Sequence, residues 1–173
     1  MHKPLLYFLP FICLFLLINS HGVFVLKPTV SSGEIAPDVK TTVDRQQILR
    51  LVNDARSRGR QCGSSYENAA EPLKWNVQLQ RAAQQHSEDM YRRNYFSHTS
   101  KDGTPFYMRI RRQGYQYFTC AENIGKGYEN EISVIKGWLG SPGHCSNLMG
   151  SAHTDFAVAR TGEYWVMVLG SKD

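Results

Sequence analysis

The sequence lacks the short motifs that mark several large classes of enzyme. Its 173 residues contain no glycine-rich nucleotide-binding loop, no His-Glu-x-x-His helix and no Gly-x-Ser-x-Gly elbow. These absences argue against a nucleotide-dependent enzyme, a metalloprotease of the His-Glu-x-x-His type and an α/β-hydrolase. The charge excess is small, at +5, and no strip of aromatic residues accompanies it, so we expect no nucleic-acid partner. No internal repeat is visible.

The composition that remains is that of an ordinary globular protein. Hydrophobic residues make up 42% of the chain and charged residues 20%, which is enough apolar material for a real core. The length suits one domain with accessory segments rather than two full domains.

The first 22 residues predict export. An apolar run from Leu5 to Ile18 follows the basic residue Lys3, and it is too short to cross a bilayer comfortably. Ser20-His21-Gly22 then offers a small-x-small cleavage site. We therefore predict a signal peptide over residues 1–22, a secreted or periplasmic protein, and no stable membrane span after cleavage. The alternative is an uncleaved N-terminal anchor, because Val23–Leu26 extends the apolar stretch.

The segment after the leader predicts a linker, and the cysteines predict a disulfide. Residues 23–43 are rich in Pro, Ser, Thr and Gly and have no apolar period, so we expect a flexible linker before a folded domain over residues 44–173. The cysteines that remain after the leader are Cys62, Cys120 and Cys145. In an exported protein they permit one intramolecular bridge and leave one thiol over.

Five helices are expected in the folded domain, each at a side chain or proline that favours a helix start. Gln47 stands at the reciprocal capping position of the first helix, and Gly59 and Gly114 are expected to end the first and third. The expected starts are Asp44, Asn76, Thr104-Pro105, Glu131 and Ser141-Pro142.

The end of the chain changes from helical to strand character. Phe156–Ala159 and Tyr164–Leu169 are short apolar runs around a turn. The second run is apolar on both faces, which is typical of a central strand covered by helices on each side. Ala121–Ile124 is expected to supply another strand. Together these elements predict an α+β fold, a three-layer α-β-α sandwich.

Three polar segments stand where loops or element ends would present them, and each supplies one candidate site residue. His144 falls in the first turn of the fifth helix, where the helix dipole disfavours imidazolium and leaves the neutral ring that binds metal or takes a proton. His98 follows an aromatic pair in a loop. Glu122 lies in a short strand and needs a partner if it is buried, which His98 or His144 could supply. From spacing alone, a structural role and a functional one are equally consistent for His144. For His98 a structural role is the more common one, and for Glu122 an exposed position is the simpler interpretation.

Other reactive side chains have simpler interpretations. His86 lies on the apolar side of the second helix and reads as a core histidine with its hydrogen bonds satisfied, whereas His153 has no place assigned by spacing. Cys120 reads as a structural or leftover thiol rather than a nucleophile. The arginine clusters read as solvated helix faces and ends: Arg56, Arg58, Arg60, Arg109, Arg111 and Arg112.

Six segments, in this order, resemble the CAP superfamily of SCP-like domains, in its bacterial branch. They run from about Gln46 to Gly170, which is nearly the whole folded domain. One such motif alone is weak, but six in the right order are specific. The segments are Leu51-Val52-Asn53 with Arg56, Pro72-Leu73-Lys74-Trp75-Asn76, Tyr95-Phe96-Ser97-His98, Ala121-Glu122-Asn123-Ile124, Gly137-Trp138-Leu139-Gly140-Ser141-Pro142-Gly143-His144, and Tyr164-Trp165-Val166-Met167-Val168-Leu169-Gly170.

The resemblance implies a sandwich of the CAP/SCP type in which His98, Glu122 and His144 meet in one surface cleft. It also implies a further acidic residue in this cleft, for which the sequence offers Asp155, a weaker candidate because it is one carbon shorter than the usual glutamate. A Cys62–Cys145 bridge fits the same resemblance and would leave Cys120 unpaired. Some eukaryotic relatives bind divalent metal in the cleft, and some bind sterols or other lipids elsewhere on the fold.

Three functions are compatible with these features. The preferred hypothesis is a secreted binding module whose His98, Glu122 and His144 hold a small ligand or a divalent cation such as zinc. The second is a hydrolase, either a protease or a cell-wall enzyme, with Glu122 or His144 as general base. The third is a lipid- or protein-interaction domain with a vestigial cleft. The expected partners are accordingly an unidentified small ligand, a lipid or a component of the cell envelope.

Overall fold

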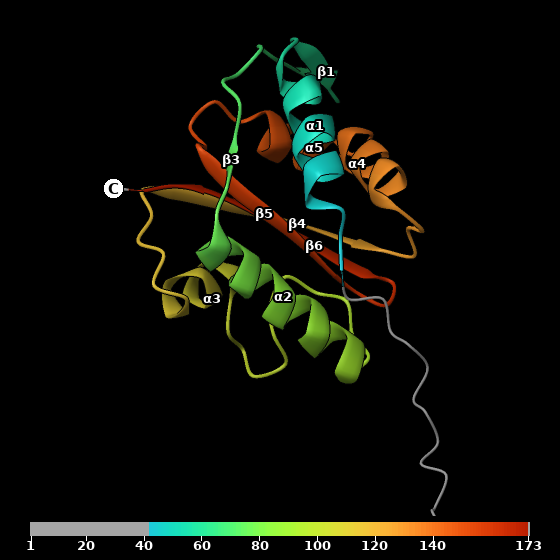
Figure 1. Ribbon diagram of the computed structural model, residues 1–173, viewed down its shortest axis with the longest axis vertical. Helices are drawn as coiled ribbons and strands as arrows, with labels where there is room; N and C mark the ends of the chain where they lie inside the picture. The colour runs from blue at the N-terminus through green and yellow to red at the C-terminus, as the bar shows by residue number, and fades with distance from the viewer. Residues whose placement is uncertain (1–41, 173) are drawn as a thin grey trace, which may run out of the picture. The chain divides into compact units, whose positions relative to one another are not determined.

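The computed structural model describes residues 42–172 (Figure 1). The predicted signal peptide over residues 1–22 lies outside the described residues, and so does nearly all of the predicted linker over 23–43. Among the residues described, no helix is long and apolar enough to cross a membrane.

The first helix, α1 (Arg45–Arg56), begins at the predicted cap. The Asp44 side chain accepts a hydrogen bond of 2.9 Å from the backbone N–H of Gln47. The reciprocal bond predicted from the Gln47 side chain is wrong, because the Asp44 N–H donates instead to Oε1 of Glu131 at 2.9 Å. A residue 87 positions away in the sequence thus completes the cap. The helix ends at Arg56, before the predicted stop at Gly59.

The next two helices cover one face of the sheet. Helix α2 (Val77–Arg92) is capped as predicted, since the Asn76 side chain accepts hydrogen bonds from the N–H groups of the first turn. Helix α3 (Phe106–Arg112) begins one residue later than predicted, because Pro105 adopts an extended conformation and is itself the N-cap. Gly114, at φ +78°, follows its C-terminus.

The last two helices cover the opposite face. Helix α4 (Glu131–Leu139) has the predicted bounds and is capped by the Asn130 side chain. Helix α5 (Pro142–Met149) starts with Pro142 as predicted, where the missing N–H costs no intrahelical bond.

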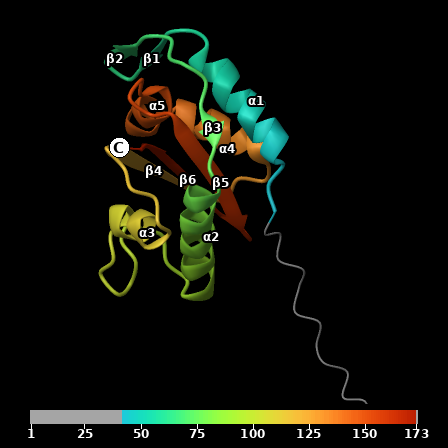
Figure 2. The same ribbon diagram turned by 60° about the vertical axis from the view of Figure 1, so that its left-hand side comes forward.

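Four strands form a mixed sheet in the order β3-β5-β6-β4. The long strands β4 (Thr119–Lys126), β5 (Asp155–Thr161) and β6 (Tyr164–Ser171) are antiparallel, whereas the short β3 (Lys74–Trp75) runs parallel to β5. A separate hairpin of β1 (Arg60–Cys62) and β2 (Ser65–Glu67) was not expected from the sequence. It lies beyond the sheet, close to α5 (Figure 2).

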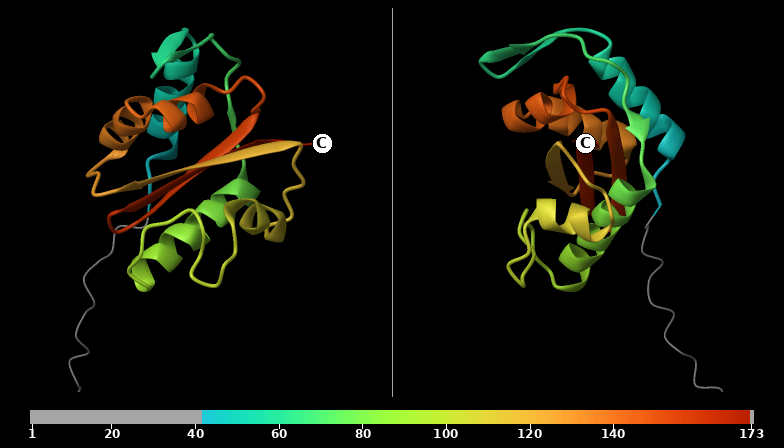
Figure 3. Two further views of the ribbon diagram at one scale, coloured as in Figure 1. Left: turned by 180° about the vertical axis from the view of Figure 1, so that it is seen from behind. Right: turned by 90° about the vertical axis from the view of Figure 1, so that its left-hand side faces the viewer.

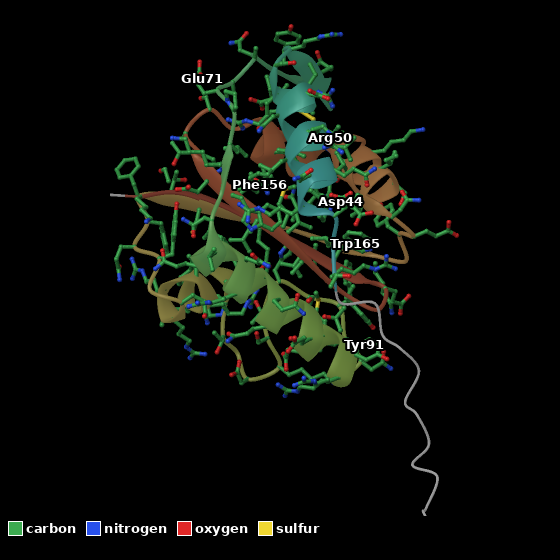
Figure 4. The ribbon with its side chains drawn as sticks, in the orientation of Figure 1. Asp44, Arg50, Glu71, Tyr91, Phe156 and Trp165 are labelled. Atoms are coloured by element: carbon green, nitrogen blue, oxygen red, sulfur yellow. A yellow bond between two sulfur atoms is a disulfide. The ribbon has the colours of Figure 1, made fainter. Side chains whose placement is uncertain are left out.

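The layers are those of the predicted α+β sandwich. Helices α1, α4 and α5 lie on one face of the sheet and α2 and α3 on the other (Figures 1 and 3). Every residue of β6 is buried, as expected of a central strand between two helical layers. Phe156 and Trp165, both labelled in Figure 4, face the core under α1, α4 and α5, whereas Val166 and Val168 face α2 and α3.

Arg56 is fully buried, so its interpretation as a solvated residue is wrong. Its guanidinium donates to the carbonyl of Glu71 at 2.9 Å and, from Nη1, to the carbonyls of Leu148 and Gly150 at 2.8 and 3.0 Å. The C-terminal carbonyls of α5 have no partners within the helix, and Arg56 satisfies them. The first helix and the last are therefore joined through a buried cation.

His86 and His153 are both buried histidines with an unpartnered ring nitrogen. His86 Nε2 donates to the carbonyl of Ser97 at 2.9 Å, but within residues 42–172 its Nδ1 has no partner. Only one of the two ring nitrogens therefore makes the hydrogen bond that was predicted for a core histidine. The Nδ1 of His153 is likewise unpartnered within that range. Burial lowers the pKa of both rings, and nearby Arg56 lowers the pKa of His153 further.

These two histidines predict a loss of stability in acid. In the unfolded chain an imidazole titrates near pH 6.5, whereas in the folded domain both rings take up a proton only at lower pH. The unfolded state therefore binds more protons below about pH 6.5, and the free energy of unfolding should fall as the pH drops through that value. Glu122 and Asp89 oppose part of the shift at His86 and Arg109 adds to it, but burial dominates.

Urea unfolding between pH 5 and 8 measures this effect. The double variant His86→Gln, His153→Gln should show a flatter dependence on pH than the wild type, because the glutamines do not titrate. His86→Gln retains an N–H donor for the Ser97 carbonyl, which limits the structural damage. Equal slopes in the two proteins would contradict the assignment.

Candidate functional site

The centre of the candidate site is a three-residue array on the α2–α3 side of the sheet. Glu122, on β4, is 5% exposed. Its Oε1 lies 2.9 Å from Nδ1 of His98, and its Oε2 accepts a hydrogen bond of 2.7 Å from Nη2 of Arg109. The same Nη2 donates to the carbonyl of His98 at 2.9 Å. Arg109 therefore holds both the carboxylate and the loop that carries the histidine.

This array fixes which nitrogen of His98 is available. A carboxylate only accepts hydrogen bonds, so Nδ1 of His98 carries the proton that faces Glu122. In the neutral ring, Nε2 is then the nitrogen with a free lone pair. The His98 side chain is 48% exposed, so this nitrogen belongs to a partly solvated group. Orientation of a histidine by a carboxylate is typical of metal-binding and proton-transferring histidines.

His144 lies on the opposite side of the sheet, on α5, and also lines a hollow beside β4. It lies in the first turn of α5, and its carbonyl accepts a hydrogen bond of 3.0 Å from Nδ2 of the buried Asn123. Asn147, one turn later, donates to Oδ1 of Asn123 at 2.9 Å. Burial lowers the pKa of His144, and His98 lowers it further. The neutral form of the His144 ring is therefore favoured more than that of an ordinary histidine.

Two hollows lie along β4 and hold these residues. The first, of about 420 Å³, is lined by His98, Glu122, Asn147, Phe106, Cys120 and Ala121. The second, of about 270 Å³, is lined by His144, Phe96, Tyr128, Trp138 and the neighbouring residues of β4, from Ile124 to Lys126. Seen from behind, β4 is the nearest strand, with α4 and α5 above it and α3 below it (Figure 3). We refer to the two hollows together as the β4 cleft.

Asp155 lies outside the β4 cleft. It stands at the start of β5, which β6 separates from β4, so two strand spacings, about 10 Å, lie between them. Its Oδ2 accepts a hydrogen bond of 2.8 Å from the buried hydroxyl of Tyr115. The carboxylate thus anchors the loop after α3 and lines neither hollow.

The cysteines are arranged as the resemblance implies. Cys62 and Cys145 form a disulfide that joins β1 to α5, and Cys120 is free. Cys120 lines the first hollow, and burial raises the pKa of its thiol. The protonated form is favoured, so Cys120 is not an activated nucleophile.

Sequence reasoning missed Arg109 and the two asparagines of the site. Arg109 is only 7% exposed, so its interpretation as a solvated helix residue is wrong. One signal was present in the sequence: a carboxylate predicted inside a strand needs a cation if it is buried. Nothing in the spacing showed which of the arginines would reach it, because α3 and β4 meet only in the folded chain.

Comparison with known proteins identifies the family. The family model described as the cysteine-rich secretory protein family, CAP, matches residues 49–168. The chain belongs to the CAP family. The chain is 30% identical over 141 residues to an uncharacterised membrane protein of Bacillus subtilis, YlbC, covering 82% of this chain and 38% of that protein. It is 36% identical over 123 residues to the uncharacterised protein YkwD of the same organism, covering 69% of this chain and 44% of that protein.

Solved structures agree on the fold. An extracellular SCP-domain protein of Bacillus anthracis is similar with a TM-score of 0.66 and 30% identity, covering 74% of this chain and 40% of that one. A structure described as NaASP2 with Zn²⁺ is similar with a TM-score of 0.51 and 15% identity, covering 75% of this chain and 80% of that one. The second likeness shows the fold alone. The CAP domain spans about two fifths of the curated relatives that it matches.

The side chains of the cleft set a limit on metal binding. Within the part of the chain that the structure describes, no group of three His, Cys, Asp or Glu side chains is placed to hold a metal ion. Glu122, the predicted carboxylate ligand, has its oxygens engaged by His98 and Arg109. The residues therefore do not fit a closed zinc site with four protein ligands.

Proposed function

We propose that this CAP domain is an exported ligand-binding module and that the β4 cleft is its binding site. The proposal is supported by a carboxylate-oriented histidine, His98, in one of two hollows along β4 and by a second histidine, His144, in the other. The rigid support of both histidines by buried groups favours binding rather than a purely structural role. The described relative from Bacillus anthracis is an extracellular protein, which supports export of this chain as well.

In this proposal, a divalent cation such as zinc is one component that the cleft accepts. His98, through Nε2, and His144 would hold it, while Glu122 orients His98 and does not bind the metal itself. Such a cation would supply a positive charge that polarises or anchors a bound ligand. That NaASP2 was crystallised with Zn²⁺ is a property of that protein, and it makes zinc a reasonable first probe here.

Calorimetric titration of zinc tests the proposal. We expect heat of binding with the wild type and a loss of affinity of about tenfold or more in His98→Ala and in His144→Ala, since each removes one of two ligands. Affinity should also fall in acid, because a protonated imidazole does not bind a cation. Asp155→Asn is the matched control and should bind zinc like the wild type. Equal heats in the wild type and both histidine variants would contradict the proposal.

A second candidate function, hydrolysis, is favoured by the His98–Glu122 pair itself. A histidine whose Nδ1–H is held by a carboxylate can use Nε2 as a general base toward water. Because burial raises the pKa of the Cys120 thiol, water rather than this cysteine would be the nucleophile. Cleavage of a fluorogenic peptide library should then persist in Cys120→Ala and vanish in His98→Ala. Turnover that survives His98→Ala combined with His144→Ala would exclude this cleft as the active site.

A further inference from the structure

Strand β4 is an edge of the sheet, and its outer side forms the floor of the β4 cleft. Among the strands of residues 42–172, ordered β3-β5-β6-β4, only β6 pairs with it. The view from behind shows no other strand or helix in front of it (Figure 3). A strand edge that has no partner strand is a template for pairing wherever its N–H and C=O groups are left free.

The register decides which backbone groups face outward. The Gly127 N–H donates to the carbonyl of Glu163 at 3.0 Å, which continues the pairing of Lys126 with Tyr164 by one residue. Hydrogen-bonded pairs alternate along an antiparallel ladder, so Ala121, Asn123 and Gly125 bond to β6. The N–H and C=O groups of the alternate residues therefore face the cleft: Cys120, Glu122, Ile124 and Lys126.

Two side-chain hydrogen bonds confirm that the carbonyls of Ile124 and Glu122 face the cleft. They also leave N–H groups rather than carbonyls available at these two residues. The carbonyl of Ile124 accepts a hydrogen bond of 3.1 Å from Nε1 of Trp138, and the carbonyl of Glu122 accepts one of 3.4 Å from Nδ2 of Asn147. By contrast, the N–H groups of Glu122 and Ile124 have no acceptor within residues 42–172. Both residues are about 95% buried, at 5% and 6% exposed. At these two residues the edge thus offers N–H donors, while their carbonyl acceptors are already used.

From this arrangement we infer that the β4 cleft binds a peptide segment in an extended conformation, laid along β4. The inference rests on the proposed function, namely that this cleft binds a ligand. Donors two residues apart on a strand are about 6.8 Å apart, which is the spacing of the carbonyls on one side of an extended peptide. A peptide therefore supplies acceptors to the Glu122 and Ile124 amides in succession, as in strand-addition recognition.

The two hollows fit the side chains of such a peptide. The first is centred on residues 120–122 and the second on residues 124–126, so they are about four residues, or 13 Å, apart along the strand. Phe106 contributes an apolar wall to the first hollow, and Phe96 and Trp138 contribute walls to the second. The hollows therefore favour a peptide with apolar side chains about four positions apart.

Amide NMR of the full domain tests the inference with an internal control. The probe is a library of blocked hexapeptides with apolar residues at varied positions, followed by titration with its tightest binder. We expect downfield shifts and slowed hydrogen exchange for the amides of Glu122 and Ile124, with little change for Ala121, Asn123 and Gly125, which bond to β6. Absence of binding by any peptide, or shifts without this alternation, would overturn the inference. Protection of the Glu122 and Ile124 amides by self-association, seen as a dimer in light scattering, would also overturn it.

Variants separate this inference from the proposed function. Phe96→Ser removes a wall of the second hollow and should weaken peptide binding about tenfold, whereas Ile132→Ser, an equally exposed apolar residue that lines neither hollow, should not. Zinc binding that depends on His98 and His144, together with no peptide binding, would leave the proposed function intact and reject the peptide. Loss of both would reject both.

Discussion

Replacing Arg109 with leucine is expected to lower the free energy of unfolding by about 3–5 kcal/mol. The change leaves the carboxylate of Glu122, which is 2% exposed, without its cation in the interior. It also removes the donors that hold the carbonyl of His98, the carbonyl of Thr104 and the hydroxyl of Ser100. The loop with His98 should loosen, so zinc or ligand affinity should fall along with stability. Urea unfolding and calorimetry measure the two effects.

Two further variants show whether burial is the cause. Arg92→Leu removes an exposed arginine that lies 3.5 Å from Glu88 on α2, and such surface pairs contribute little. It should change stability by less than about 1 kcal/mol. Arg109→Leu combined with Glu122→Gln removes the buried charge as well and should recover much of the loss. If Arg109→Leu were as mild as Arg92→Leu, the buried ion pair would not stabilise the site as argued.

Replacing both Cys62 and Cys145 with serine is expected to lower the free energy of unfolding by about 4 kcal/mol. The bridge spans 83 residues of sequence, so its loss frees a long loop in the unfolded chain. In the folded chain it ties β1 to α5, beside His144. The variant should therefore also bind ligand more weakly, because α5 and its first turn are less firmly held. Urea unfolding with and without reductant measures the change.

Cys120 supplies the control for that experiment. Cys120→Ala removes a half-buried thiol without touching the bridge, and we expect a loss of about 1 kcal/mol or less. Reductant should destabilise Cys120→Ala as much as the wild type and should leave the double serine variant unchanged. Equal stability of all three proteins under reducing and oxidising conditions would show that the bridge does not contribute.

Local signals in the sequence were enough to predict the helices and the layers. The caps at Asp44 and Asn76 and the proline at the start of α5 act through neighbours a few residues away, so they are visible without a fold. The continuous apolar run of β6 likewise predicts that the strand is buried on both faces, as it is. Each of these features depends on the backbone within one turn or one strand.

The site could be predicted only in part, because the side chains that contact each other in it come from distant segments of the chain. His98, Glu122 and His144 were predicted from motifs. In the structure, Nδ1 of His98 is hydrogen-bonded to the carboxylate of Glu122. Arg109 was missed because a buried and a solvated arginine look alike in a helix pattern. Asp155 was expected near the cleft, but the strand order puts β6 between it and β4. Strand order is a property of the whole chain, and no local pattern encodes it.

The hydrogen bond between the Asp44 N–H and Glu131 bears on where this domain can be cut. The family model matches from residue 49 onward, a position inside α1 and after the residue that closes its cap. A fragment trimmed to that limit would lose the first turn of α1 and leave a buried Glu131 oxygen without its donor. The part of the chain that completes α1 therefore starts before the first residue that the family model matches.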